Sequence, residues 1–215
     1  MRVSARFGGR SGVVGMGYVH FNLVNSATCA AMAPPPLMGG GFGVATLPAG
    51  MAGWGAGSYI IVNTNTNNRY AGISGNLTSR FNTRMAVVTE MGFAPATMAL
   101  IGVCWGHTFV RNTAPALAGW GAGAALPGGT LVQPAPPAAF AALIDGAPIH
   151  LEHLLIRFCA TQLGAGGTVS NNVLMAPYTN PAPNNITVRL SYGAMGGLFA
   201  AGWQQAVWVA GGPAW

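Results

Sequence analysis

The chain has 215 residues, enough for one domain with a sizeable apolar core, and only 6% of them are charged, against roughly a quarter in an ordinary soluble domain. All nine basic residues are arginine and they outnumber the three acids, Glu90, Asp145 and Glu152, so the formal net charge is +6. Mean hydropathy is +0.43, yet Pro, Gly, Asn or Gln interrupts every long uncharged run, which argues against a transmembrane helix and against a membrane partner.

The positive charge is compatible with a polyanionic partner such as nucleic acid, although the arginines form no obvious cluster in the sequence. The cysteines, Cys29, Cys104 and Cys159, are odd in number and widely spaced. This pattern favours buried thiols in a reducing compartment over a disulfide framework. The apolar run near the N-terminus is interrupted by His20 and Asn22, so it makes a poor signal peptide. We therefore expect a cytoplasmic protein.

Residues 1–56 are expected to form a Gly/Pro-rich extension, with MAPPPLMGGGFG as one of its densest stretches. Two short runs rich in β-branched and aromatic residues follow, at 59–63 and 69–73, separated by the polar sequence TNTNN. This arrangement predicts a hairpin whose adjacent antiparallel strands carry Tyr59 and Tyr70.

The next predicted element is a helix at 76–84, with Ser74 or Asn76 able to cap it. A helix at 95–100 then leads into a strand at 101–110, and an insertion rich in Gly and Pro follows around 112–140. The clearest helix in the chain is expected to open near Pro148 and to end at Gly164. Two late strands, in NITVRLSYG and QQAVWV, belong to a C-terminal extension, 176–215, that we expect to pack on the domain.

The helix that follows Pro148 places a carboxylate among apolar side chains. At 100° per residue, Glu152 shares a side with Ile149, Ile156 and Cys159, whereas the histidines and the arginine of this helix share a polar side. A carboxylate in an apolar setting is costly unless a cation, a metal or several donors meet it. Glu152 is therefore either the partner of an arginine or a metal-binding or catalytic carboxylate at the floor of a cleft.

Together, the hairpin and the glutamate helix resemble the GIY-YIG nuclease family. The small domain of that family begins with a hairpin that carries two tripeptides, then has a helix with an arginine and a later helix with a glutamate. GSYIIVN stands at the first motif, with Tyr59 at its tyrosine and Ser58 in place of isoleucine. RYAGIS stands at the second motif, with Tyr70 and Gly72 kept and Ala71 in place of isoleucine.

The resemblance continues beyond the hairpin and covers roughly 57–172. Arg80 follows Tyr70 by ten residues, the family's usual offset, and LEHLLIRF, centred on Glu152, resembles the glutamate helix. The sequence TVSNN offers the late asparagine of the family at Asn171 or Asn172. The main departure lies one helical turn after the arginine, where the family often has a histidine or a tyrosine and this chain has arginine. A histidine from the predicted strand at 101–110 could replace that helper.

The resemblance implies an α/β mixed (α+β) domain at 57–175, with a small, mainly antiparallel sheet flanked by helices. It also implies a metal-dependent endonuclease that hydrolyses the phosphodiester bonds of DNA. Glu152, with waters, would hold one Mg²⁺ or Mn²⁺, and Arg80 would clamp the scissile phosphate. Tyr59 would activate or orient the attacking water, Tyr70 would hydrogen-bond the phosphate or the nucleophile, and Asn171 would complete the site.

Three alternatives stand beside the nuclease. The first is a catalytically reduced domain that binds nucleic acid or a protein partner without cutting. The second is a structural or assembly protein, because so few charges also predict burial against another subunit and hence a homo-oligomer or a protein partner. The third is a zinc site drawn from two paired ligand sets and one further cysteine: Cys104, His107, His150, His153 and Cys159.

Overall fold

The computed structural model describes residues 17–23, 30–31, 56–63, 66–82, 101–112, 130–132, 140–163, 168–192 and 202–215. Their helices and strands, in chain order, are β1 Gly17–Asn22, β2 Ala30–Ala31, β3 Gly57–Asn63, β4 Arg69–Ser74, α1 Leu77–Asn82, β5 Ile101–Arg111, β6 Thr130–Val132, β7 Ala141–Ile144, β8 Ala147–His150, α3 Leu151–Thr161, β9 Ile186–Tyr192 and β10 Gly202–Trp208. The helix expected at 95–100 lies outside the described residues.

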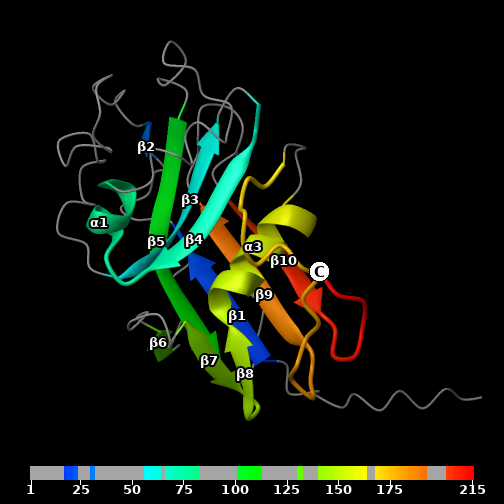
Figure 1. Ribbon diagram of the computed structural model, residues 1–215. Coiled ribbons are helices and arrows are strands. Elements are labelled where there is room, and N and C mark those ends of the chain that lie inside the picture. The colour runs from blue at the N-terminus through cyan, green and yellow to red at the C-terminus, as the bar shows by residue number, and fades with distance from the viewer. Residues whose placement is uncertain are drawn as a thin grey trace, which may run out of the picture.

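One large sheet dominates the fold (Figure 1). Its main path runs β10-β9-β1-β5-β3-β4, with β2 and β6 paired to β5, and β7 and β8 form a separate hairpin. The sheet is mixed because β1 and β9 are parallel, while the other pairs are antiparallel. The expectation of a small sheet flanked by helices is therefore wrong. The sheet is larger because β1, from the Gly/Pro-rich N-terminal region, and β9 and β10, from the C-terminal region, join the predicted hairpin.

The predicted hairpin is confirmed. Tyr59 on β3 is paired with Gly72 on β4, and Ile61 is paired with Tyr70. The TNTNN turn is closed by backbone hydrogen bonds, and Asn67 adopts the left-handed conformation, with φ 61, that asparagine tolerates better than most residues. Polar turn chemistry between two strand-forming runs thus gives the antiparallel pairing that the sequence predicts.

The described helices match the prediction to different degrees. α1 is described over Leu77–Asn82, and the last two residues of the predicted helix lie outside the described residues. Its N-cap is Asn76, whose Oδ1 accepts a hydrogen bond from the Ser79 N–H at 2.9 Å. α3 begins at Leu151, because the residues before it, Pro148 included, pair with β7 as strand β8. The start of α3 is capped by a histidine, which the sequence did not suggest.

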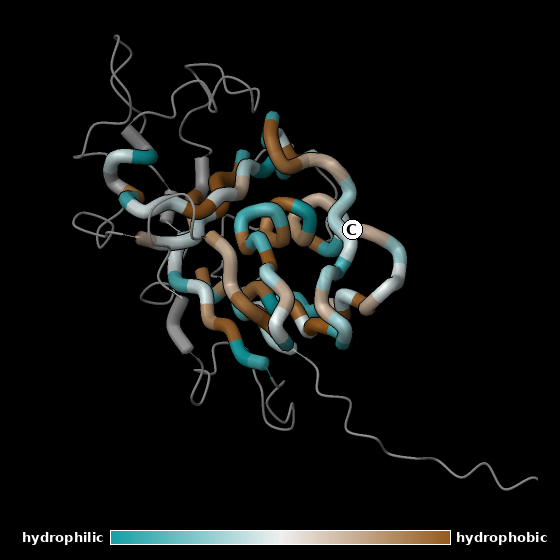
Figure 2. Tube along the Cα trace, turned by 60° about the horizontal axis from the view of Figure 1, so that its bottom comes forward, coloured by the Kyte–Doolittle hydropathy of each residue, from teal (hydrophilic) through white to brown (hydrophobic). Residues whose placement is uncertain are grey.

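The core lies between α3 and one face of the sheet. Alternate residues of the strands point to this face, and they meet the apolar side of the helix. Members of this layer include Val19, Phe21, Ile60, Val62, Val188 and Leu190 from the strands and Leu154, Leu155 and Phe158 from α3. Figure 2 shows that α3 is amphipathic, with apolar residues on one side and hydrophilic residues on the other. Burial of each such side chain stabilises the fold by about 1.5–3 kcal/mol.

The opposite face of the sheet carries a different set of side chains. The residues that alternate with the core layer point there, and many are aromatic or polar, yet buried: Tyr18, His20, Tyr59, Tyr70, Trp105, Thr187, Arg189 and Ser191. Both faces of the central strands are therefore buried. No helix in the described part of the chain is long and apolar enough to cross a membrane.

Candidate active site

The two tyrosines of the hairpin lie together on the sheet face that points away from α3. Their rings are stacked, with centroids 6.2 Å apart and an interplanar angle of 26°. Tyr59 is 1% exposed and Tyr70 is 7% exposed. The strand register explains the contact, because Tyr59 and Tyr70 occupy neighbouring positions on the same face of two paired strands.

Gly72 makes room for the ring of Tyr59. A Cβ atom at this position would lie 2.7 Å from the Tyr59 hydroxyl oxygen and 2.8 Å from Cζ, closer than van der Waals contact allows. The phenol of Tyr59 therefore lies directly over the backbone of β4. This contact gives a physical reason for pairing a tyrosine in the first motif with a glycine in the second.

Glu152 lies at the outer edge of β4. Its Oε1 accepts a hydrogen bond from the Ile73 N–H at 3.1 Å, and the side chain is half-buried at the border of the apolar layer. The prediction that this carboxylate points into the apolar stripe is therefore only partly right, because the first turn of α3 carries it to the sheet edge. Within the described part of the chain, Oε2 accepts no hydrogen bond.

Asn171 binds the same edge of β4 at Ala71, two residues before Ile73. Its Oδ1 accepts from the Ala71 N–H at 3.1 Å, and its Nδ2 donates to the Ala71 carbonyl oxygen at 2.7 Å. The backbone before it also pairs with β4, because the Arg69 N–H donates to Thr168 O and the Ser170 N–H donates to Arg69 O, both at 2.8 Å. Asn172 is exposed, so Asn171 is the asparagine that contacts β4.

Arg80 lies in α1, the helix that follows β4. The first residue of that helix, Leu77, packs against Gly57 on the tyrosine face, where a Cβ at Gly57 would lie 2.8 Å from Leu77 Cδ1. α1 therefore begins on the same side of the sheet as Tyr59 and Tyr70. Arg80 is half-buried in its last turn, and the arginine expected one turn later lies outside the described residues.

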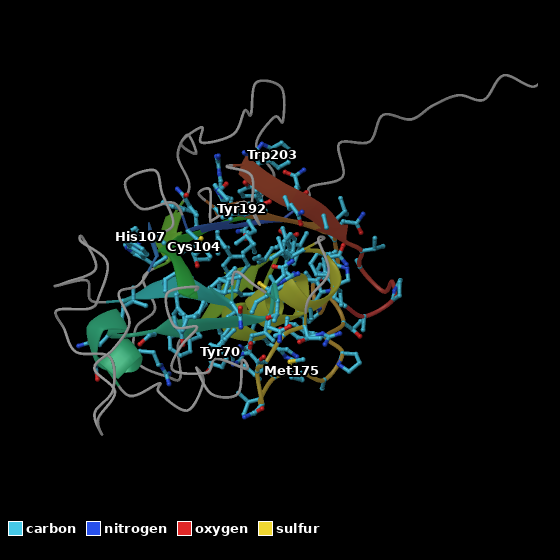
Figure 3. The ribbon with its side chains drawn as sticks, turned by 90° about the horizontal axis from the view of Figure 1, so that it is seen from above. Tyr70, Cys104, His107, Met175, Tyr192 and Trp203 are labelled. Carbon is cyan, nitrogen blue, oxygen red and sulfur yellow. The ribbon has the colours of Figure 1, made fainter. Side chains whose placement is uncertain are left out.

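The five predicted site residues do not share one face of the sheet. Tyr70 lies on β4 and Tyr59 on the paired strand β3, Glu152 and Asn171 bond the backbone of β4, and Arg80 follows on α1. Tyr59 and Tyr70 stack on the face away from α3, and Arg80 follows on the helix that starts there. Glu152 and Asn171 contact the strand's outer edge, and Glu152 reaches it from the α3 side. In Figure 3, Tyr70 of β4 and Trp203 of β10 lie at opposite sides of the molecule.

Sequence reasoning missed the role of Arg69, which opens the second motif. This side chain is 2% exposed and points to the α3 side, where Nη1 donates to Cys159 O at 3.0 Å and to Leu163 O at 2.7 Å. The guanidinium therefore binds the carbonyl end of α3, where the helix dipole favours a cation. Burial lowers the pKa of Arg69, and it raises the pKa of the free Cys159 thiol to about 12, an effect that the charge of Arg69 opposes.

A second buried polar cluster was also missed. His20 on β1 bonds Ser191 on β9, with Nε2 and Oγ 2.7 Å apart, and the Arg189 guanidinium carbon lies 4.2 Å from the Trp203 ring centroid. Burial and, to a smaller extent, the positive charge of Arg189 together lower the pKa of His20 to about 3. Burial also raises the pKa of Tyr18, which Arg189 opposes. The available signal was a polar residue at alternate positions of GYVHFN and ITVRLSY, each within an apolar strand.

The paired zinc ligands are not brought together. His150 caps α3 through Nδ1, which accepts the His153 N–H at 3.2 Å, and the His153 ring stacks on Tyr178 with centroids 4.2 Å apart. Cys104 and His107 are three residues apart on β5, so they point to opposite faces, although Figure 3 shows them near each other along the strand. Across the described residues, no three His, Cys, Asp or Glu side chains are placed to hold a metal ion.

The state of the cysteines differs from the expectation. Cys159 is a free buried thiol as predicted, but Cys104 is disulfide-bonded, so the expectation of thiols alone is wrong. Disulfides are rare in a reducing compartment. The argument from cysteines therefore does not support the cytoplasmic expectation.

Comparisons with protein-family models, with curated proteins and with solved structures found no match for this chain.

Proposed function

We propose that this chain is a metal-dependent endonuclease that hydrolyses phosphodiester bonds in DNA. The observation that carries the proposal is a group of residues gathered around the β3–β4 hairpin. The ring of Tyr59 packs on Gly72, Tyr70 stacks beside it, and Glu152 binds the backbone of Ile73. Arg80 follows on the helix that leaves this strand. These are the residues that the motif resemblance selects, and Glu152 comes from a segment far from the others in the sequence.

Glu152 fits a role as the single protein ligand of Mg²⁺ or Mn²⁺. Its Oε1 is fixed by the Ile73 N–H, and Oε2 has no hydrogen-bond partner among the described residues. Mg²⁺ is commonly held by one or two carboxylates and several waters, so the lack of a larger acidic cluster in the described residues is compatible with this ion. When bound, the ion supplies charge neutralisation at the leaving oxygen of the phosphodiester.

The other residues contribute binding and orientation. Arg80 binds the scissile phosphate, for which a guanidinium is suited by its charge and its paired donors. Tyr59 orients the attacking water, and Tyr70 hydrogen-bonds the phosphate or the nucleophile. Asn171 acts through β4, the strand that carries Tyr70. Its side-chain amide accepts from the Ala71 N–H and donates to the Ala71 carbonyl oxygen, and these two bonds hold the strand in place.

The decisive experiment compares Glu152→Gln with Glu152→Ala. The Gln side chain retains an oxygen that can accept the Ile73 N–H, so the protein should keep its melting temperature while losing Mg²⁺- or Mn²⁺-dependent plasmid cleavage by at least about 100-fold. The Ala variant removes the acceptor as well, and it should also lose about 1–3 kcal/mol of stability. Cleavage by Glu152→Gln at the wild-type rate would refute the assignment of Glu152.

A catalytically reduced DNA-binding domain is the second candidate. The observation that favours it is that Glu152 and Asn171 both satisfy the backbone of an edge strand, which is a structural role, while Tyr59 and Tyr70 are almost fully buried. Such a protein would bind duplex DNA with an affinity that falls as salt rises, because arginine contacts release counterions, but it would cleave nothing. Absence of binding at low salt would remove both candidates.

A further inference from the structure

The two outer edges of the large sheet differ in whether other groups bond to their backbone. The outer edge of β4 is covered by the 168–171 segment and by Glu152. At the other end, β10 pairs with β9, and within the described residues no strand pairs with its outer side. Figure 1 shows β10 at the border of the sheet.

The register identifies which backbone groups of β10 face outward. The Ser191 carbonyl accepts the Leu23 N–H, so odd-numbered residues of β9 direct their backbone groups toward β1. The even-numbered residues of β9 therefore bond β10, and their partners are Gly202, Gln204, Ala206 and Trp208. The N–H and C=O groups of the alternate residues, Trp203, Gln205 and Val207, point away from the sheet.

This edge lacks the features that normally prevent strand pairing. Edge strands are usually blunted by charges, proline, bulges or short length. The sequence of β10, GWQQAVW, has seven residues, no charge and no proline, and it pairs continuously with β9. It also exposes large apolar side chains, with Trp203 at 37% and Val207 at 43%. Such an edge is a template for another strand.

We propose that β10 pairs antiparallel with β10 of a second copy of this chain, about a two-fold axis at Gln205. This register is the one that pairs all seven residues of both strands. It places Trp203 of each copy opposite Val207 of the other, so the exposed apolar side chains cover one another. It also places the two Gln205 side chains face to face. The buried Oε1 of Gln205, which has no hydrogen-bond partner among the described residues, gains an amide donor from the opposite copy.

The lack of charged side chains on β10 favours pairing with a second copy of this strand over pairing with an acidic or basic peptide. β10 has no charged side chain with which to select a charged partner, and two copies meet there without like charges in contact. Each chain nevertheless carries a formal charge of +6, so the copies repel one another at long range. Salt screens this repulsion. Dimerisation should therefore strengthen as salt rises, the opposite of the salt dependence expected for DNA binding.

A cysteine at the axis tests the register directly. Paired Cα atoms of antiparallel strands lie about 4.5–5.5 Å apart, within disulfide range. Under mild oxidation, Gln205→Cys should form a covalent dimer, whereas Gln204→Cys and the exposed off-sheet control Val173→Cys should not. The native Cys159 is buried and should not interfere. Equal crosslinking of the three variants, or none in Gln205→Cys, would overturn the proposed interface.

A second measurement does not depend on oxidation. Sedimentation of the wild-type chain at tens of micromolar should give the mass of a dimer, and Gln205→Pro should shift it to the monomer because proline removes the outward N–H. Val207→Lys keeps that N–H and should weaken the dimer at least about 10-fold by placing a charge at the interface. A monomeric wild-type protein would end the proposal. Neither result depends on DNA cleavage, so the interface and the nuclease fail or survive separately.

Discussion

At the scale of single residues, the contact between Tyr59 and Gly72 connects the two halves of the hairpin. The aromatic ring occupies the space above β4 that any other residue at position 72 would fill with its Cβ. The backbone of Gly72 does not have positive φ, so conformation does not explain the glycine. Space for the ring is the reason, and this reason can be tested apart from catalysis.

Gly72→Ala should lower the free energy of unfolding by about 1–3 kcal/mol, because the added methyl group overlaps the Tyr59 ring. In a Tyr59→Ala background, the same substitution should cost nothing, since the backbone accepts alanine and the ring is gone. Urea denaturation of the four proteins measures this coupling. Equal costs in both backgrounds would show that Gly72 serves another purpose.

His20 should make stability depend on pH. Burial and the charge of Arg189 hold its pKa at about 3, below the ordinary 6.5, so the unfolded chain binds the proton more readily than the folded chain. Above pH 6.5 the group is neutral in both states. As pH falls below 6.5, stability should drop by up to about 1.4 kcal/mol for each pH unit until it nears 3.

Urea denaturation at pH 8, 6 and 5 measures this dependence, with His20→Gln as the comparison, because glutamine stays neutral and retains a polar group near Ser191. The wild type should lose stability faster than the variant between pH 6 and pH 5. Parallel pH dependence in the two proteins would show that His20 is protonated in the folded state.

At the scale of elements, sequence patterns predicted local structure better than they predicted pairing across the chain. The TNTNN turn defines the β3–β4 hairpin, and Asn76 caps α1, because both signals act over a few residues. The start of α3 was missed because the residues before it pair with β7 as β8. β1 was missed for a similar reason: it pairs with β9, far along the chain, and it lies in a region rich in Gly and Pro.

The candidate site shows the same division. The motif resemblance selected Tyr59, Tyr70, Arg80, Glu152 and Asn171. The structure stacks the two tyrosines on the β3–β4 hairpin and bonds Glu152 and Asn171 to the backbone of β4, whereas Arg80 lies on α1. The sequence did not indicate that Glu152 and Asn171 bind the edge of β4. Every residue except proline has a backbone N–H, so no residue type marks the position to which such a side chain bonds. The sequence did not indicate Arg69 at the end of α3 for the same reason.

Asn171→Ala should destabilise the edge of β4. It removes both hydrogen bonds to Ala71, and leaving those backbone groups unsatisfied should cost about 1–3 kcal/mol. The Ala71 amide proton should exchange with solvent faster in the variant than in the wild type. Asn172→Ala is the matched control, because this neighbouring side chain is exposed, and it should leave stability within about 0.5 kcal/mol. Equal effects of the two substitutions would contradict the edge-capping role.

At the scale of the whole molecule, low charge and high apolar content agree with a sheet whose central strands are buried on both faces. The buried arginines use partners other than carboxylates among those described: Arg69 binds carbonyl groups, and Arg189 lies against an aromatic ring. The chain has only three acids, and of these Glu152 lies at β4. The proposed function depends on the negative charge of Glu152 at the edge of β4.

The proposed function requires that Glu152 and Arg80 act in one site for DNA cleavage. The initial rate of supercoiled-plasmid cleavage in Mn²⁺, with an EDTA blank, tests this claim for the wild type, Glu152→Gln, Arg80→Ala and the double variant. Groups that act as a unit are non-additive, so each single substitution should reduce the rate at least about 100-fold and the double variant should be no slower than the slower single variant. A wild-type rate equal to the EDTA blank would show that the protein is not a metal-dependent nuclease, and single-variant losses that multiply in the double variant would show that the two residues act independently.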